Sequence, residues 1–591
     1  MKALNGYDYL VICIYMTILV GVGFYFLRYM KAAADYFKAA NRLTWWVAGL
    51  SSFMSAFSVW MFTGGAGIVY REGLTGAVAL GLPGLAIFTG YLVFARLWRR
   101  SRVTTLMEYL EHRFNLPTHQ IASWSYVPVY LLYSGTALFS LGIFISTAFN
   151  LDIILVIWVS GIVILAYTLL GGLWAVSVND TIQFLILFPV CLLLVPLSLV
   201  AVGGIDGLVQ ASPAGYFSFP SRGLPWHYLV AYLVILIHGQ NTNPVAQRYF
   251  SVRNEAQARK VALLCTSLFA FGVVFWAVPP MAARVLYPDL GKILDLPNTD
   301  EGAFVVIAMH LLPHGLMGLM IAAMFAAAMS SLDSVYNAMA GIISKDIYQR
   351  AFNRSMSEER LLRVGQAVTL AIGLLVIGLS MLMVEYGRGV FSVMMKISSL
   401  TITPLATPML LGFLYRRAPA WSCLLSFTCS VAVAAVFAFH LPLVSYLQSL
   451  GPWVDFSVST FSIVFVGAAT FLVSPYVFRA GAAERQRIRE FFSKLDTPVD
   501  EAKEIRAAEI DRTSIAGFIG KISMLLGGLI VLFIFIPGSV KERLINVLQG
   551  FLLLGFGFWM YFIGKRTRTA DLSTALPNVG PSTSPPDKGG R

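Results

Sequence analysis

The chain has 591 residues, of which 57% are apolar and 12% are charged, and its formal net charge is +13. This charged share is about half that of an ordinary soluble domain, so most of the surface is expected to face lipid, and a soluble enzyme is excluded. The five cysteines lie in apolar stretches, without metal-ligand spacing or the paired pattern of an oxidised module, which favours a role as small core residues.

Fifteen apolar runs are long enough to cross a membrane, since about 20 residues span the ~30 Å hydrocarbon core. The sequence therefore predicts an all-α polytopic membrane protein with about 15 transmembrane helices. The first run begins beside Asp8 and has no small-residue cleavage site, so we expect a retained helix and not a signal peptide. The runs are 7–27, 44–70, 74–95, 121–149, 153–170, 181–203, 226–246, 261–283, 303–332, 364–384, 391–415, 420–439, 456–474, 515–536 and 547–563.

The distribution of lysine and arginine predicts the orientation. With the N-terminus outside, the segments placed in the cytoplasm hold 33 of the 43 Lys and Arg residues, and the segments placed outside hold 8. The other two, Lys396 and Lys521, lie within runs. By the positive-inside rule we expect the N-terminus outside and the C-terminus in the cytoplasm, in a plasma (inner) membrane. The basic charge is thus topological and predicts no nucleic-acid partner.

The expected spans divide the chain into eight segments. These are a leading helix and cytoplasmic loop (1–43), a first five-span set (44–203), an extracellular loop (204–225), a second five-span set (226–415), two additional helices (416–475), a cytoplasmic amphipathic segment (476–514), two C-terminal helices (515–564) and a disordered cytoplasmic tail (565–591). In segment 476–514 we expect an amphipathic helix that ends at Thr497-Pro498 and lies on the membrane surface as a spacer, in preference to a regulatory site.

Two of the apolar runs contain residues that break helices, from Phe62 to Gly67 and from His238 to Pro244. A glycine costs about 1 kcal/mol and a proline about 3 kcal/mol in a helix interior, and unwound backbone at membrane depth is tolerated where it lines a cavity or pathway. Close helix packing would explain either glycine cluster alone. Because each break lies in the first span of a five-span set, the pattern predicts an inverted repeat with a binding site between the broken helices.

Five short runs, in order along residues 7–415, carry a family resemblance. They are Asp35 to Arg42 followed by Trp45-Trp46, Thr105 to Phe114, Gly171 to Val176 leading to Asp180 and Gln183, Gln247 to Tyr249, and Ala327 to Ser334 closing with Lys345 to Tyr348. Together they resemble the sodium:solute symporter family. The resemblance implies a LeuT-like fold of five-plus-five inverted repeats, with one leading and about four trailing helices. It also implies sodium-coupled symport of a small organic solute by alternating access, with Na⁺ as coupling ion and no enzymatic activity.

A first sodium site is predicted near Ser330 and Ser331. Sodium takes oxygen ligands, which a membrane helix supplies as hydroxyls and as carbonyls freed at a break, and these serines stand opposite the break in 44–70. The resemblance implies that the carbonyls of Ala327, Met54 and Phe57 complete the site. The alternative is that the serines bond back to their own helix.

A second sodium site is a further hypothesis. Ser330, Asp333 and Ser334 stand at i, i+3 and i+4 and therefore share one helix face, and the resemblance places Asp180 opposite them. Two carboxylates in such a space repel each other unless a cation lies between them. The alternative is that Asp333 caps or bonds to neighbouring backbone.

The solute is expected at the midplane, between the broken helices. Where the sugar branch of the family presents amide, carboxylate and ammonium groups, local alignment places apolar residues, so a hexose would leave hydroxyls unpaired at about 1–3 kcal/mol each. With Trp60 and the polar turn Gln240 to Asn243, this favours a smaller, partly apolar solute such as an amino acid or a carboxylate. Trp60 could equally serve packing. The aligned apolar residues are Ala56, Met61, Leu80, Phe269 and Met395.

Two polar residues inside runs have alternative explanations. Lys396 could attract an anionic solute or extend outward to water, and the second is favoured. His238 could couple protons, but bonding to carbonyls freed at the break is favoured.

Two further function classes stay open beside the sodium symporter. The same scaffold could be driven by protons, with Asp180, Asp333 or His238 as a relay. A membrane-embedded sensor is disfavoured, because no signalling domain follows residue 564. A nucleotide-driven pump lacks its phosphate-binding loop. The solute, the stoichiometry and the oligomeric state are not predicted.

Overall fold

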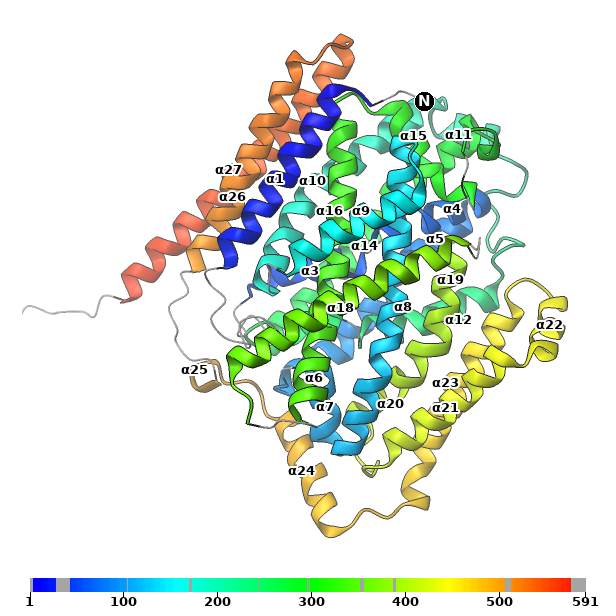
Figure 1. Cartoon of the computed structure of the whole chain (residues 1–591), viewed down its shortest axis with the longest axis vertical. Coiled ribbons are helices and arrows are strands. Elements are labelled where there is room, and N and C mark those ends of the chain that lie inside the picture. The colour runs from blue at the N-terminus through cyan, green and yellow to red at the C-terminus, as the bar shows by residue number, and fades with distance from the viewer. Residues whose placement is uncertain are drawn as a thin grey trace, which may run out of the picture. The chain divides into compact units, whose positions relative to one another are not determined.

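The computed structural model describes residues 4–27, 43–103, 105–169, 173–242, 244–294, 296, 298–350, 355–385, 390–504 and 512–575, and every regular element among them is helical (Figure 1). The chain forms two compact units, residues 1–506 and 507–591. Asparagine, aspartate and threonine side chains cap several of the helices, each accepting a hydrogen bond from the first turn.

The first half of unit 1 holds the leading helix and the first expected repeat. Its elements are α1 (Gly6–Leu27), α3 (Trp45–Ala56), η2 (Val59–Met61), α4 (Gly64–Glu72), α5 (Leu74–Thr89), η3 (Gly90–Phe94), α6 (Ala95–Arg100), α7 (Leu106–Arg113), α8 (Leu116–Phe149), α9 (Ile153–Thr168), α10 (Leu173–Ala201) and α11 (Gly204–Ala211).

The second half of unit 1 holds the second expected repeat and the helices that follow it. Its elements are α12 (Trp226–Gln240), α13 (Pro244–Phe250), α14 (Glu255–Leu286), η4 (Leu290–Lys292), η5 (Thr299–Gly302), α15 (Ala303–Leu311), α16 (Leu316–Gly341), η6 (Ile342–Gln349), α18 (Glu358–Glu385), α19 (Val390–Ile397), η7 (Ser398–Ile402), α20 (Thr403–Leu414), α21 (Ser422–Phe439), α22 (Leu441–Ser449), α23 (Val454–Val477), α24 (Ala482–Asp496) and α25 (Glu501–Glu504).

The described residues contain 11 helices that are long and apolar enough to cross a membrane, or 12 with the bent pair α3–α4. The other three expected spans fall on α1, α9 and the pair α12–α13, which are not among these helices. A multi-pass, all-α membrane protein is thereby confirmed, whereas the count of 15 crossings stays a prediction.

The expected span 303–332 is wrong in its boundaries. It consists of α15, which ends at Leu311, and of α16, which begins at Leu316. Pro313 lacks a backbone donor and Gly315 adopts φ +86°, so the apolar run cannot continue as one helix there.

Both spans predicted to be broken are discontinuous, but the first break begins at Phe57, before the predicted Phe62 to Gly67, and Gly64 to Gly67 are helical in α4. α3 ends at Ala56, and Phe57 and Ser58 are extended, with ψ of 109° and 164°. The chain then bends by 55° before it continues through η2 and α4. α12 ends at Gln240, and α13 begins at Pro244. Both five-span sets therefore start with a discontinuous helix.

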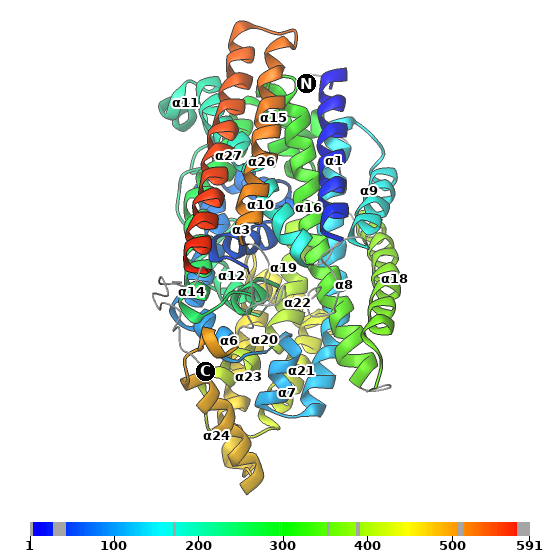
Figure 2. The same cartoon turned by 90° about the vertical axis from the view of Figure 1, so that its left-hand side faces the viewer.

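The first unit is organised around α16, which is almost wholly buried and lies among α1, α8 and α10 (Figures 1 and 2). Its N-terminus is capped by the fully buried Asp8 of α1, whose Oδ1 accepts hydrogen bonds from the N–H groups of Gly315 (2.7 Å) and Gly318 (3.0 Å). A carboxylate is favourable at a helix N-terminus, because it satisfies free N–H groups and opposes the helix dipole. Asp8 thus joins the leading helix to the helix that carries the predicted ion ligands.

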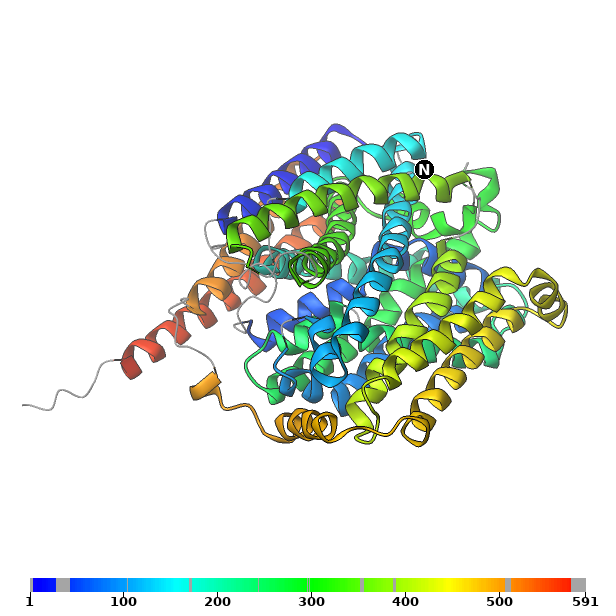
Figure 3. The same ribbon diagram turned by 60° about the horizontal axis from the view of Figure 1, so that its bottom comes forward.

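The amphipathic segment forms α24, which runs across one end of the bundle (gold in Figure 3). Its apolar residues Ile488, Phe491, Phe492 and Leu495 are buried. Phe491 packs against Tyr109 of α7, with ring centroids 5.8 Å apart. The predicted helix is therefore confirmed, but its apolar face is covered by the protein and not by a membrane surface.

The second unit is a helical hairpin of α26 (Arg512–Val531) and α27 (Val540–Ala575), joined through η8 (Leu532–Phe535). Glycines let the two backbones approach closely, since a Cβ on Gly520 would lie 2.7 Å from the carbonyl oxygen of Gly557. α27 continues to Ala575, so the first part of the tail expected to be disordered from residue 565 is helical.

Candidate functional site

Buried polar side chains from three helices meet at Asp180 of α10. Ser51 of α3 donates to Asp180 Oδ2 (2.5 Å), and Ser330 of α16 donates to Asp180 Oδ1. Arg248 of α13 places Nη2 3.8 Å from Oδ2. Because all four side chains are at most 2% exposed, these contacts form in a site of low dielectric, where each unpaired charge would be costly.

Arg248 extends the cluster to a further serine of α16. Its Nη2 donates to Ser334 Oγ (3.0 Å), and its Nε donates to Ser51 Oγ (3.2 Å). Ser334 Oγ also lies 3.4 Å from Ser55 Oγ of α3. The cluster therefore connects the discontinuous helix α3 to α16 at the level of the predicted ion ligands.

Asp333 lies on the same face of α16 but has its own partner. Thr168, the last residue of α9, donates to Asp333 Oδ1. Both side chains are about 1% exposed. The alternative considered for Asp333 was a cap or a bond to neighbouring backbone. The structure instead shows a bond to a side chain of another helix.

Two of the predicted first-site ligands lie at the break of α3. Met54 and Phe57 are each 1% exposed. In a continuous α-helix the Met61 N–H would donate to the Phe57 carbonyl. Here it donates to the Ser58 carbonyl instead (3.0 Å). The carbonyls of the last turn of a helix have no partner within the helix, and Met54 belongs to that turn. The break thus frees carbonyl oxygens beside α16.

The other three predicted first-site ligands, Ala327, Ser330 and Ser331, lie on α16 and are all buried. The Ser331 hydroxyl lies 3.1 Å from the carbonyl oxygen of Ala327 and donates to it. For Ser331 this is the bond back to its own helix that was the alternative to an ion site, so the role of Ser331 as a ligand stays a prediction. Ser330 instead donates to Asp180, so it belongs to the cluster around that carboxylate.

The predicted solute residues fall into two groups in unit 1. Trp60 and Leu80 both contact Gly65 of α4, where an added Cβ would lie 2.8 Å from a Leu80 methyl and 3.4 Å from the Trp60 ring. Phe269 belongs to an aromatic cluster at the break, 5.0 Å from Phe53 and 5.9 Å from Trp276 between ring centroids. The other described members with apolar side chains, Ala56, Met61 and Met395, are buried on α3, η2 and α19.

One residue of the predicted polar turn, Asn241, bonds to α5 and α6. The side-chain amide of Asn241, next to Gln240, donates to Thr89 Oγ1 (3.0 Å), and its backbone carbonyl accepts from the Trp98 indole (2.8 Å). These partners lie two or more turns beyond Leu80 along α5 and α6. Asn241 therefore has a structural role, and Asn243 lies outside the described residues.

His238 bonds to its own helix, with Nδ1 2.7 Å from the carbonyl oxygen of Val234. The hydroxyl of Thr242 donates to the His238 carbonyl (2.7 Å), which satisfies backbone near the break. The favoured explanation of this histidine was a bond to a carbonyl freed at the break. His238 does contact a carbonyl, but that carbonyl belongs to Val234, inside the helix.

Four polar residues of the site have no role in the sequence-based prediction: Arg248, Ser51, Ser55 and Thr168. A signal existed for Arg248, because an arginine beside a broken apolar run is a functional candidate by default. The serines and the threonine carry no comparable signal, since hydroxyls in membrane helices commonly bond to their own backbone.

Comparison with known proteins identifies the family. Residues 36–427 match the sodium:solute symporter family, which is well over half of the chain. The chain belongs to this family. The symporter is a sodium-coupled transporter, and Na⁺ is its coupling ion.

Several characterised relatives are similar to this symporter. The sodium/sialic acid symporter NanT of Aliivibrio fischeri is 27% identical over 442 residues, which cover 72% of this chain and 86% of the relative. The human sodium/myo-inositol cotransporter 2 is 28% identical over 455 residues, which cover 70% of this chain and 67% of the relative. The rabbit (Oryctolagus cuniculus) sodium/glucose cotransporter 1 is 27% identical over 460 residues, which cover 70% of this chain and 69% of the relative.

A solved structure shows the same fold. It is a Na⁺-coupled sialic acid symporter in a substrate-bound, outward-open state, with a TM-score of 0.67 at 24% identity, covering 79% of this chain and 98% of the other. The predicted LeuT-like architecture is therefore confirmed.

Proposed function

We propose that this symporter carries a small, partly apolar organic solute, such as an amino acid or a carboxylate, across the plasma membrane together with sodium by alternating access. The break of α3 beside Ala327 to Ser331 of α16 is the observation that carries the proposal. Carbonyls freed at Met54 and Phe57, with the Ser331 hydroxyl, supply the neutral oxygen ligands that a monovalent cation needs in a dry site.

A second sodium beside Asp180 is supported by charge. With Asp180, Asp333 and Arg248 ionised, the polar cluster carries one net negative charge, because a single guanidinium offsets one of two carboxylates. A monovalent cation would balance that charge, and hydroxyls of Ser330 and Ser334 lie beside it. Asp333 and Asp180 would then share their cation without direct repulsion.

The choice of solute rests on the side chains near the first break. Relatives of this symporter are named for sialic acid, myo-inositol and glucose. Trp60, Leu80 and Phe269 instead present apolar surface, and each hydroxyl of a polyol left unpaired against them would cost about 1–3 kcal/mol. A solute with one charged group and a short apolar part fits this chemistry better than a hexose.

Uptake into proteoliposomes tests the proposal. Labelled amino acids, carboxylates, hexoses and sialic acid would each be offered under an inward sodium gradient, a potassium gradient or a proton gradient. We expect sodium-dependent accumulation of an amino acid or a carboxylate, with little response to protons. Accumulation of a hexose, or accumulation driven by protons alone, would contradict the solute or the coupling that we propose.

The orientation in the membrane is tested by cysteine labelling. We propose that the N-terminus is outside and α24 is cytoplasmic, so Arg485→Cys should react only with reagent added from the cytoplasmic side. Lys292→Cys, in the loop between α14 and α15, should react only from outside. Both side chains are exposed. The exposed Cys13 must first be replaced, because it would label as well. Reversed labelling would invert the topology.

A further inference from the structure

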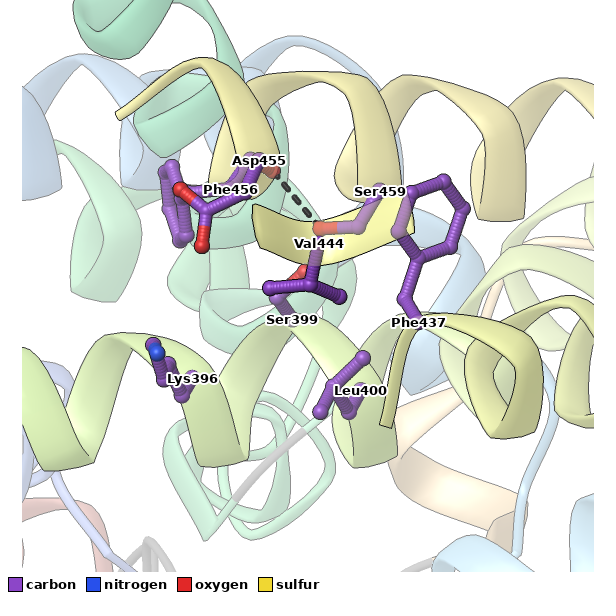
Figure 4. Close-up of a pocket in the computed structure, with 8 residues that line it drawn as sticks. All are labelled: Lys396, Ser399, Leu400, Phe437, Val444, Asp455, Phe456 and Ser459. Atoms are coloured by element: carbon purple, nitrogen blue, oxygen red, sulfur yellow. Dashed lines mark hydrogen bonds between the residues drawn. The ribbon is translucent and has the colours of Figure 1, made fainter. Parts of the chain in front are cut away.

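An open pocket lies between α19, η7, α21, α22 and α23 (Figure 4). Two oppositely charged side chains line it, Lys396 at the end of α19 and Asp455 at the start of α23. In Figure 4 they stand on facing walls, and the hydroxyls of Ser399 and Ser459 lie farther along. The pocket is separate from the cluster around Asp180, and the transport mechanism above gives it no role.

Among the described residues, the two charged groups of the pocket do not form an ion pair with each other. Asp455 Oδ2 accepts from Gln448 Nε2 at 2.9 Å, and not from the Lys396 ammonium on the facing wall. An ammonium within an apolar segment is costly unless an anion or water satisfies it. A ligand carrying one negative and one positive group would satisfy both walls at once.

The position of the pocket indicates where such a ligand comes from. α22 connects the end of α21 to the start of α23, whereas the other end of α23 leads to α24, so the pocket lies at the end of the α21–α23 pair that is distant from α24. Large apolar side chains beside it are exposed, with Phe439 at 84%, Leu441 at 69% and Tyr446 at 62%. In a membrane protein such a surface contacts acyl chains near the interface.

We propose that this pocket binds the headgroup of a zwitterionic phospholipid that carries a primary ammonium, as in phosphatidylethanolamine. The phosphate pairs with Lys396, and the ammonium donates hydrogen bonds to Asp455 and to the serine hydroxyls. The acyl chains follow the exposed apolar surface of α21 and α22. A quaternary choline group has no N–H to donate, so the pocket distinguishes it from ethanolamine.

Thermal unfolding of the purified, delipidated full-length symporter tests the proposal. Phosphatidylethanolamine, phosphatidylcholine and phosphatidylglycerol with identical acyl chains are added in turn, beside soluble glycerophosphoethanolamine. We expect the ethanolamine lipid to raise the unfolding midpoint most. Lys396→Met and Asp455→Asn should each remove at least half of its increment over the choline lipid. Lys292→Met is the matched control, because its side chain is 81% exposed in a loop, and it should keep the full increment.

Native mass spectrometry supplies a second readout in case a substitution changes stability by itself. It counts the lipids retained by each variant, and we expect one ethanolamine lipid fewer in Lys396→Met and in Asp455→Asn. Three results would overturn the proposal. In the first, phosphatidylglycerol stabilises the protein as much as phosphatidylethanolamine does, and this effect depends on Lys396 alone. In the second, the soluble headgroup stabilises it as much as the ethanolamine lipid. In the third, the lipid response is the same in the two variants and in the control.

Discussion

Ser330 on α16 donates a hydrogen bond to the carboxylate of Asp180 on α10, although 150 positions separate the two residues in the chain. Asp180 belongs to the first five-span set, and Ser330 belongs to the second. Arg248, from the second set, approaches the same carboxylate to 3.8 Å. The two sets are therefore joined by polar contacts at this carboxylate.

The first prediction concerns this carboxylate. Asp180→Asn removes the charge that holds the proposed second sodium, so the Hill coefficient for sodium in uptake assays should fall from above one toward one. Initial uptake rates in proteoliposomes over a range of sodium concentrations measure it. Asp152→Asn, at the exposed N-cap of α9, is the control and should leave the coefficient unchanged. A coefficient of one in the unmodified protein, with full activity in Asp180→Asn, would exclude the second sodium.

The second prediction concerns the first sodium site. Ser331→Ala deletes a hydroxyl oxygen that lies 3.1 Å from the Ala327 carbonyl, and one lost ligand contact of about 1–2 kcal/mol should raise the half-maximal sodium concentration roughly 5- to 30-fold. Sodium activation of uptake measures the change. Ser344→Ala is a matched control, since this buried serine makes the same type of bond, to Ala340, farther along the same helical stretch. Unchanged activation in Ser331→Ala would remove Ser331 from the site.

The sequence predicts discontinuous spans at α3–α4 and α12–α13 because glycine, proline and clustered polar residues have large local costs in a membrane helix. It misplaces the first break, since the chain is extended at Phe57 and Ser58, whereas Gly64 to Gly67 are helical. It also predicts that Ser330, Asp333 and Ser334 share a face, since helix geometry alone requires that. The end of α15 was missed, although His310, Pro313, His314 and Gly315 interrupt the apolar run there.

The contacts of Arg248 and the docking of α24 depend on tertiary placement. Arg248 reaches Asp180 from α13, and the local residues do not encode which helix of the first set packs there. The apolar pattern of an amphipathic helix is the same whether it packs on a membrane surface or on protein, so the pattern cannot distinguish the two. Tyr109 and Arg113 of α7 make the difference for α24, because they present a ring and a cation to its phenylalanines.

The third prediction concerns the docking of α24. Phe491 is 5% exposed and contacts Tyr109, so Phe491→Ala should weaken docking by about 3–5 kcal/mol if the gap does not collapse. Trypsin should then cleave faster after Arg487 and Arg489 in the purified protein. Phe439→Ala, at an 84% exposed position, is the control and should leave cleavage as it is. Equal cleavage rates in both variants would show that Phe491 does not hold the helix.

The fourth prediction is a pH dependence at the end of the same segment. Arg102 donates two hydrogen bonds to Glu504, from Nε to Oε2 (2.9 Å) and from Nη2 to Oε1 (2.7 Å). These bonds lower the pKa of the Glu504 carboxyl below its ordinary value, in spite of an opposing effect of partial burial. A carboxyl whose pKa is lower when docked stabilises docking at neutral pH, and this contribution is lost as the pH falls through the docked pKa.

Hydrogen–deuterium exchange of residues 482–504, corrected for the intrinsic rate at each pH, measures this loss. A partly exposed ion pair is worth about 0.5–1 kcal/mol, so opening of the segment should become roughly 2- to 5-fold more frequent between about pH 6 and pH 3. Glu504→Gln should show the increased opening at pH 6 already, with a flatter pH profile. Glu490→Gln is the control, because Glu490 is exposed on α24 and pairs with the neutral Gln486, so it should follow the unmodified protein. If Glu504→Gln keeps the full pH response, other carboxylates control the docking of this segment, and the Arg102–Glu504 pair does not.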